Sequence, residues 1–184
     1  MPHTFTRDKT FWIITLQGVI LNFFLGGFGP AQPLLRSDQG TSLTIAGLHG
    51  TALGVAAIFS GLMNSRLVHH FGRDKTSWIG MWIFCIGVLM FVSLKPVAFT
   101  LSATFLSGIG ISMVITNLVT RFSHHYKGAT PLALPQSNGI NSVGFVFGTI
   151  AVGTLAGTAL SWRFGLLLTI PATIILYISA RDKN

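Results

Sequence analysis

The spacing of the charged residues is the feature that most restricts how this chain can fold. Only 9% of its 184 residues are Asp, Glu, Lys or Arg, compared with about 25% in an ordinary soluble domain. Histidines aside, the charge-free stretches are residues 10–35, 39–65, 76–94, 96–120, 128–162 and 164–180. A helix that crosses the hydrocarbon core of a bilayer needs roughly 20 residues, with about 17 to 25 common. All six stretches reach that range, which predicts an all-α integral membrane protein.

Six transmembrane helices are therefore predicted, at roughly 11–35, 43–66, 77–94, 97–120, 135–158 and 163–180. They form a single transmembrane domain over residues 1–184, with no soluble domain. The first helix is expected to be retained, because its apolar run exceeds the roughly 7 to 15 residues of a signal peptide and no A-x-A-like cleavage site closes it. Two loops on the inner side, 66–76 and 121–134, hold five of the twelve lysines and arginines and both histidine pairs.

The net charge of +8 is explained by topology. With a cytoplasmic N-terminus, nine basic residues fall inside and three fall outside, which is the positive-inside bias. The nine are Arg7, Lys9, Arg66, Arg73, Lys75, Arg121, Lys127, Arg181 and Lys183. Both termini are then cytoplasmic, and the basic residues face the headgroups of the lipid bilayer. No nucleic-acid partner is predicted.

No pattern in the sequence predicts an enzyme, a metal site or a cofactor. Cys85 is the single cysteine, and the histidine pairs have no acidic or cysteine partner nearby in sequence, as a zinc site would require. No catalytic residue is therefore assigned. His49 is the one titratable side chain clearly embedded in a predicted helix, either as a proton relay or as a neutral, hydrogen-bonded histidine.

Neutral polar residues are the remaining candidates for a functional site. An unpaired amide costs several kcal/mol in an apolar medium, so each must either pair between helices or line a watered cavity that binds a polar neutral solute. The sequence leaves both alternatives open for each residue. The candidates are Gln17, Asn22, Thr116, Asn117, Asn138 and Asn141.

Glycines recur at helical spacing in the second and fifth predicted helices. Small residues on one helical face allow backbones to approach closely in lipid. The simplest interpretation is tight packing, and such faces also suit helices that slide or rock. The glycines concerned are Gly47, Gly50, Gly54, Gly144, Gly148 and Gly153.

Several short motifs resemble the N-terminal six-helix half of the Major Facilitator Superfamily. In "SRLVHHFGRDK", Gly72 and Arg73 match the loop between helices two and three of that family, while His69 replaces its aspartate. "ATFLSGIG" keeps the glycine pair of the fourth helix, with Thr104 in place of an arginine. The glycines of the fifth helix and "SWRFGLL" before the sixth also match. "GLHGTALG" and "ALPQSNGINS" are most similar to sugar-permease-like bacterial transporters.

The resemblance implies half of a Major Facilitator Superfamily fold and a function in secondary transport of a small solute by alternating access. It implies that helices one and four line a central cavity and that helices two and five meet the opposite half at their glycine faces. Gln17, Asn22, Thr116 and Asn117 would then face the solute, with Asn138 and Asn141 of the fifth helix at the cavity edge. His69, Gly72 and Arg73 would form a cytoplasmic gating loop, in a bacterial inner (plasma) membrane. A full member has about twelve helices, so the chain pairs with a second six-helix half or with a second copy of itself. The alternative is a non-transporting membrane interaction subunit or a truncated remnant.

Overall fold

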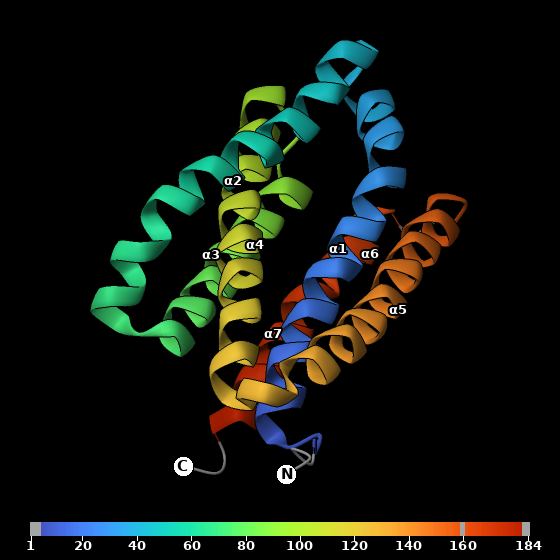
Figure 1. The fold of residues 1–184 in the computed structure, drawn as a ribbon. Helices are drawn as coiled ribbons and strands as arrows, with labels where there is room; N and C mark the ends of the chain where they lie inside the picture. Colours follow the sequence, from blue (N-terminus) through green and yellow to red (C-terminus); the bar gives the residue numbers. More distant parts are fainter. Residues whose placement is uncertain (1–4, 159–160, 182–184) are drawn as a thin grey trace.

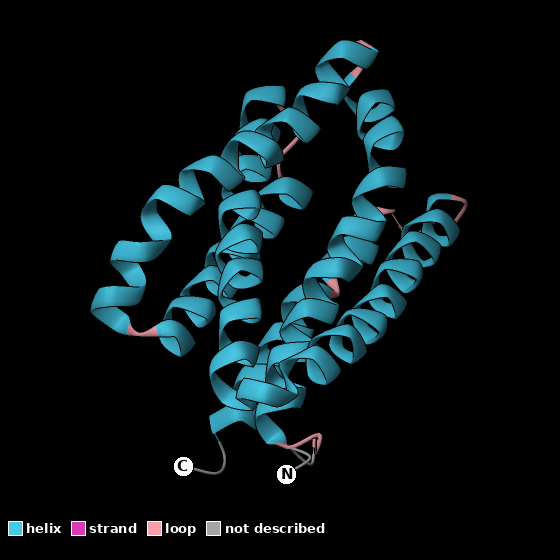
Figure 2. Cartoon of the chain, in the orientation of Figure 1, coloured by secondary structure: helices cyan, strands magenta, loops and turns pink. Residues whose placement is uncertain are grey.

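A computed structural model describes residues 5–158 and 161–181. Lys183, one of the basic residues counted above, lies outside them. The described residues form helices joined by short loops, without strands (Figures 1 and 2). In chain order the elements are α1 (Lys9–Gln39), α2 (Leu43–Phe71), α3 (Arg73–Ser93), α4 (Val97–Tyr126), the 3-10 helix η1 (Lys127–Ala129), α5 (Thr130–Ala156), α6 (Arg163–Leu167) and α7 (Thr169–Arg181).

Five stretches of the described residues, and not the six predicted, are helical, long and apolar enough to cross a membrane. They are Lys9–Gln39, Leu43–Phe71, Arg73–Ser93, Val97–Ala156 and Arg163–Arg181. The fourth stretch has 60 residues, because η1 joins α4 to α5 without an intervening coil. The chain reverses at this junction, where Lys127 has a φ of 42°. The predicted fourth and fifth helices are thus one helical stretch folded back on itself (Figure 1).

The two predicted inner loops are largely helical, which corrects their boundaries. α2 continues to Phe71 and α3 begins at Arg73, so Gly72 alone separates them. Gly72 has a φ of 78°, a conformation that side chains other than glycine rarely adopt. Its N–H still donates to Val68 O at 2.9 Å, and its carbonyl accepts from the Thr76 hydroxyl at 2.7 Å. These hydrogen bonds satisfy the backbone N–H and carbonyl of Gly72, which water would otherwise do in a loop. The helices therefore extend up to Gly72 from both sides.

The predicted last helix, 163–180, is divided into α6 and α7 at Leu168. Pro171 follows three residues later and has no N–H to donate to the carbonyl of Leu167. The proline ring also crowds that carbonyl, which interrupts the helical hydrogen-bond ladder.

The bundle has two ends that carry different contacts. The start of α1 and the end of α7 lie at one of them (Figure 1), called here the terminal end. There Lys9 donates to the carbonyl of Ala180, and Arg7 donates to Gln136 at the start of α5. The opposite end, called the far end, holds the turns after α1, α3 and α5.

Helix packing is uneven around the bundle. The most extensive contacts join α1 to α5, α3 to α4 and α2 to α4. Phenylalanines fill the centre between α1 and α3, where the rings of Phe24 and Phe84 meet edge to face at 5.2 Å. Because lipid tails are as apolar as these rings, packing rather than escape from water holds the helices together. α2 stands apart from α1 (Figure 1) and exposes Leu48, Val55, Ile58, Phe59, Leu62 and Met63.

Candidate functional site

The six polar residues predicted to line a cavity fall into two groups. Gln17, Asn117 and Asn141 are buried inside the bundle, with 0%, 1% and 6% of their surface exposed. Asn22 is partly exposed, and Thr116 and Asn138 are exposed. The first group therefore contacts other helices, whereas the second remains accessible on helices long enough to span a membrane.

Gln17 belongs to a cluster of three helices at the terminal end. Its Oε1 accepts a hydrogen bond of 2.8 Å from Nη1 of Arg121, on α4. Nε of Arg121 lies 2.6 Å from Oδ1 of Asp74, on α3. This second contact is an ion pair rather than an aligned hydrogen bond, because the Nε proton finds no acceptor in good geometry. The cluster joins α1, α3 and α4.

Arg121 corrects one interpretation of the sequence. It was placed in an inner loop, but α4 continues past it to Tyr126 and its side chain is only 9% exposed. Its ion pair with Asp74, the residue after Arg73, was not predicted from the sequence. A buried arginine needs such a partner because desolvating the charge is costly. The spacing of four residues between Asn117 and Arg121 was a signal for one shared buried face.

Asn117 forms a second contact between helices, next to this cluster. Its Nδ2 donates to Asn64 Oδ1 on α2 and to the carbonyl of Met113, each at 2.9 Å. Asn64, which the sequence did not single out, joins α2 to α4. Asn141 packs against Gly18 of α1, where an added Cβ would lie 2.6 Å from its Nδ2. Both amides thus pack helices together.

The glycines predicted at one moving interface have opposite environments. A Cβ at Gly144 would lie 2.6 Å from the carbonyl oxygen of Val19, and one at Gly148 would overlap the carbonyl of Phe23. These two glycines bring α5 against α1. Among the described residues, and apart from the glycine's own stretch of helix, no atom lies within 4 Å of a Cβ added at Gly47, Gly54 or Gly153, and at Gly50 only Gln32 Nε2 is reached, at 4.0 Å.

The residues of the predicted gating loop lie near, but outside, the ion pair. The rings of His69 and His70 contact each other at 5.9 Å, and both side chains are exposed. Arg73 lines a cavity of about 330 Å³ at the terminal end. The cavity is lined by Thr10, Arg73, Asp74, Arg121, His124 and His125.

Asp8 directly precedes α1 at the terminal end and connects this helix to α4. Its Oδ1 accepts the N–H of Phe11 at 2.9 Å, as a helix cap, and the hydroxyl of Tyr126. Its Oδ2 lies 2.6 Å from His125 Nε2. Burial alone would raise the pKa of Asp8, but the hydrogen bonds from Tyr126, Phe11 and His125 outweigh burial and lower the pKa below 3.8.

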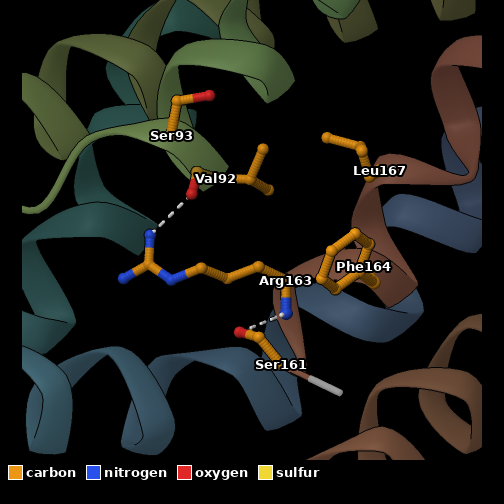
Figure 3. A pocket seen from close by; sticks show the side chains of 6 residues that line it. All are labelled: Val92, Ser93, Ser161, Arg163, Phe164 and Leu167. Carbon is orange, nitrogen blue, oxygen red and sulfur yellow. Dashed lines mark hydrogen bonds between the residues drawn. The ribbon is translucent and has the colours of Figure 1, made fainter.

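A matching arginine ties the helices together at the far end. Nη2 of Arg163 donates to Asp38 Oδ2 at 3.1 Å, and Nη1 donates to the carbonyl of Val92 at 2.9 Å. Figure 3 shows this side chain reaching across a cavity of about 230 Å³ toward the end of α3, with Phe164 and Leu167 on the other wall. Arg163 therefore closes the last turn of α3 and anchors α6 to it.

A cluster of uncharged side chains lies beside Arg163 at the far end. His49 on α2 is fully buried, and its Nε2 is 3.0 Å from the hydroxyl of Thr100 on α4. Gln39, the last residue of α1, donates to the same hydroxyl at 3.0 Å and to the carbonyl of Lys95 at 2.6 Å. The cluster joins α1, α2 and α4. Within residues 5–158 and 161–181, no group of three His, Cys, Asp or Glu side chains is arranged to hold a metal ion.

Comparison with known proteins identifies the family. The family model of the Major Facilitator Superfamily matches residues 14–181. A search of curated proteins finds no match. Among solved structures, the chain is similar to the Major Facilitator Superfamily proton:xylose symporter XylE bound to 6-bromo-6-deoxy-D-glucose, with a TM-score of 0.69 and 17% identity.

That similarity covers 92% of this chain and 44% of the symporter, so the chain spans less than half the length of the protein it matches. The fold is shared over nearly all of the described helices. The family model covers the same helices, from the first to the last. This chain is an integral membrane protein of the Major Facilitator Superfamily.

Proposed function

We propose that the chain forms one wall of a secondary transporter that moves a small, neutral polar solute by alternating access. The observation that carries the proposal is the accessibility of Asn22, Thr116 and Asn138 on membrane-spanning helices. Polar side chains left accessible at membrane depth are costly unless they face water or a ligand. Family membership supports the same conclusion.

A neutral solute fits the distribution of charge. The acidic residues of the described helices, Asp8, Asp38 and Asp74, lie at the two ends, and each pairs with a basic side chain. The accessible residues between the ends are amides and hydroxyls, which bind hydroxyl-rich solutes by hydrogen bonds. The similarity to a proton:xylose symporter supports a sugar as the solute class.

In this proposal, the second wall of the transport pathway lies outside the described helices and faces α2 and α5. Both helices expose apolar side chains, and Gly47 and Gly54 leave room for a close helix from outside the bundle. The wall is supplied by further sequence of the same protein, by a second copy or by a separate partner. The terminal end faces the cytoplasm of a bacterial cell, because it carries most of the basic residues.

The gate at that end includes the loop residues singled out from the sequence. Gly72 gives α3 a pivot of one residue, and Arg73 is placed beside the Asp74–Arg121 ion pair. A rotation of α3 about Gly72 would separate Asp74 from Arg121. His69, about one turn earlier on α2, lines a neighbouring cavity of about 320 Å³.

The test is solute binding and uptake in membrane vesicles that contain the protein. A panel of monosaccharides is expected to include one that raises the thermal unfolding midpoint and is taken up. Asn22→Leu and Thr116→Val are expected to abolish both effects without changing the midpoint in the absence of solute. Ser102→Ala is the matched control, because Ser102 is an exposed polar residue of α4 outside the predicted cavity set, and its hydroxyl donates to Ala98 of its own helix as the Asn22 amide donates to Gly18. A stable protein that binds no solute of the panel would contradict the proposal and favour a non-transporting subunit.

A further inference from the structure

His49 is an unusual residue for its position. It lies within α2, is fully buried, and contacts the Phe91 ring edge to face at 6.2 Å. The four acidic residues of the sequence are all aspartates, at positions 8, 38, 74 and 182. The three that the structure describes lie at the helix ends. A proton that enters the interior of this bundle therefore meets an imidazole and no carboxylate.

The surroundings of the ring identify which nitrogen carries the proton in the neutral form. Nδ1 lies 3.2 Å from the carbonyl of Ile45 and 3.2 Å from that of Ala46. Carbonyl oxygens only accept hydrogen bonds, so Nδ1 is the protonated nitrogen. Nε2 is then an acceptor, and the Thr100 hydroxyl, 3.0 Å away, donates to it.

The hydroxyl of Thr100 has a second acceptor within reach. Its oxygen lies 3.1 Å from the carbonyl of Val97 and accepts a hydrogen bond from Gln39 at 3.0 Å. When His49 gains a proton at Nε2, that N–H donates to the hydroxyl oxygen, and the hydroxyl proton turns to Val97. A hydroxyl has one donor and two acceptor positions, so the hydrogen bonds of the imidazole ring and of the Thr100 hydroxyl are satisfied in both forms.

Charged groups nearby are already engaged with other partners. On the adjoining elements Asp38 pairs with Arg163, and the Arg36 guanidinium donates to the carbonyl of Thr41. Lys95 meets the cluster through its backbone carbonyl. No charged side chain among the described residues hydrogen-bonds to the ring. Backbone carbonyls at Nδ1 and the hydroxyl at Nε2 are thus what stabilises an added proton.

We propose that His49 is a proton-binding site, and that the Thr100 hydroxyl serves both protonation states by changing its acceptor. Binding a proton reverses the hydrogen bond that joins α2 to α4 at the far end. In the proposed transporter this proton is the coupling ion. The coupling role rests on the proposed function, whereas proton binding by His49 does not.

The direct test is nitrogen NMR of histidine-labelled protein in lipid bilayers between about pH 4 and pH 8. His49→Gln assigns the signal by its loss. The neutral form is expected to carry its proton on Nδ1 and to convert to the imidazolium within this range. A ring that stays neutral throughout, or that carries its proton on Nε2, overturns the proposal.

Thr100→Val tests the role of the hydroxyl with little change of shape. Hydrogen bonds to charged groups are stronger than those between neutral groups, so the imidazolium loses more than the neutral ring does. The affinity of His49 for a proton should fall about tenfold, which lowers its titration midpoint by about one pH unit. Ser102→Ala, on the same helix, should leave the midpoint unchanged. An unchanged midpoint in Thr100→Val overturns the acceptor change.

Uptake measurements separate the two proposals. In vesicles with a pH gradient, His49→Gln should still bind the solute but should lose the dependence of uptake on the gradient. Dependence that persists in this variant overturns the coupling role. A wild-type protein whose His49 titrates as expected but which binds no solute leaves the proton site standing and contradicts the proposed transport function.

Discussion

The α1–α5 interface and the free face of α2 both carry glycines at helical spacing. These glycines have opposite surroundings. Gly144 and Gly148 have the carbonyls of α1 directly against them, whereas a Cβ added at Gly47 or Gly54 would have no other described helix within 4 Å. The amides of α5 also differ: Asn141 is buried against Gly18 of α1, whereas Asn138 is exposed. Helical spacing therefore identifies a face, and only the fold determines what covers it.

The largest effect is expected from a side chain at the covered interface. Gly148→Ala places a Cβ in overlap with the Phe23 carbonyl, so α1 and α5 must separate. Overpacking of this kind costs about 1 to 3 kcal/mol of the free energy of unfolding. Unfolding in detergent, followed by circular dichroism, measures it. Gly54→Ala is the matched control and should change stability by less than about 0.5 kcal/mol; equal losses would contradict the distinction between the two faces.

The ion pair at the terminal end is expected to have the next largest effect. Asp74→Asn removes the charge opposite the buried Arg121 and should cost about 1.5 to 3 kcal/mol. The lower half of that range is expected because Asp74 itself is 78% exposed. Denaturant unfolding measures the loss.

A second variant shows whether the cost comes from the unpaired arginine. Arg121→Met in the Asp74→Asn protein removes the buried charge and should restore part of the lost stability. A double variant less stable than Asp74→Asn alone would show that the contact of Arg121 with Gln17 matters more than the charge balance.

The smallest effect concerns Asp8, which is exposed to solvent on one side. Its pKa in the folded protein is lowered below 3.8, so its contribution to stability is fully present above that pH and is lost as the pH falls through the lowered pKa. Asp8→Asn should therefore flatten the pH dependence of the unfolding midpoint below about pH 4. The same acid-induced loss in wild type and Asp8→Asn would remove Asp8 as its source.

Charge spacing predicted that the chain is helical and spans membranes, because a bilayer excludes charge from about 20 residues at a time. It did not predict where the helices end. The helices continue into the stretches that were expected to be loops, where Asp74 and Arg121 form an ion pair between α3 and α4. The merging of α4 with α5 through η1, and the division at Leu168, depend on local backbone hydrogen bonds that the charge pattern does not report.

The sequence predicted which types of residue form the candidate site. It did not predict which of these residues contact one another. Six polar residues were named, and half of them turn out to be packed between helices. Nothing in the sequence near Asn117 shows that Asn64 lies opposite, 53 residues away. Thr100 and Gln39 were likewise missed, because a hydroxyl and an amide at helix ends have many local uses. His49 was singled out because it is titratable within an apolar stretch.

The central claim is that the accessible polar residues line a watered pathway, and cysteine labelling in membranes tests it most directly. Single cysteines at Thr116, Asn138 and Ile175 are introduced in a Cys85→Ala background and exposed to a water-soluble, membrane-impermeant maleimide. Ile175 is the control, because it is 64% exposed in an apolar stretch of α7. Thr116→Cys and Asn138→Cys should react at least about tenfold faster than Ile175→Cys, because maleimides react with the thiolate and thiolates form in water. Equal, slow labelling at all three positions would contradict the pathway.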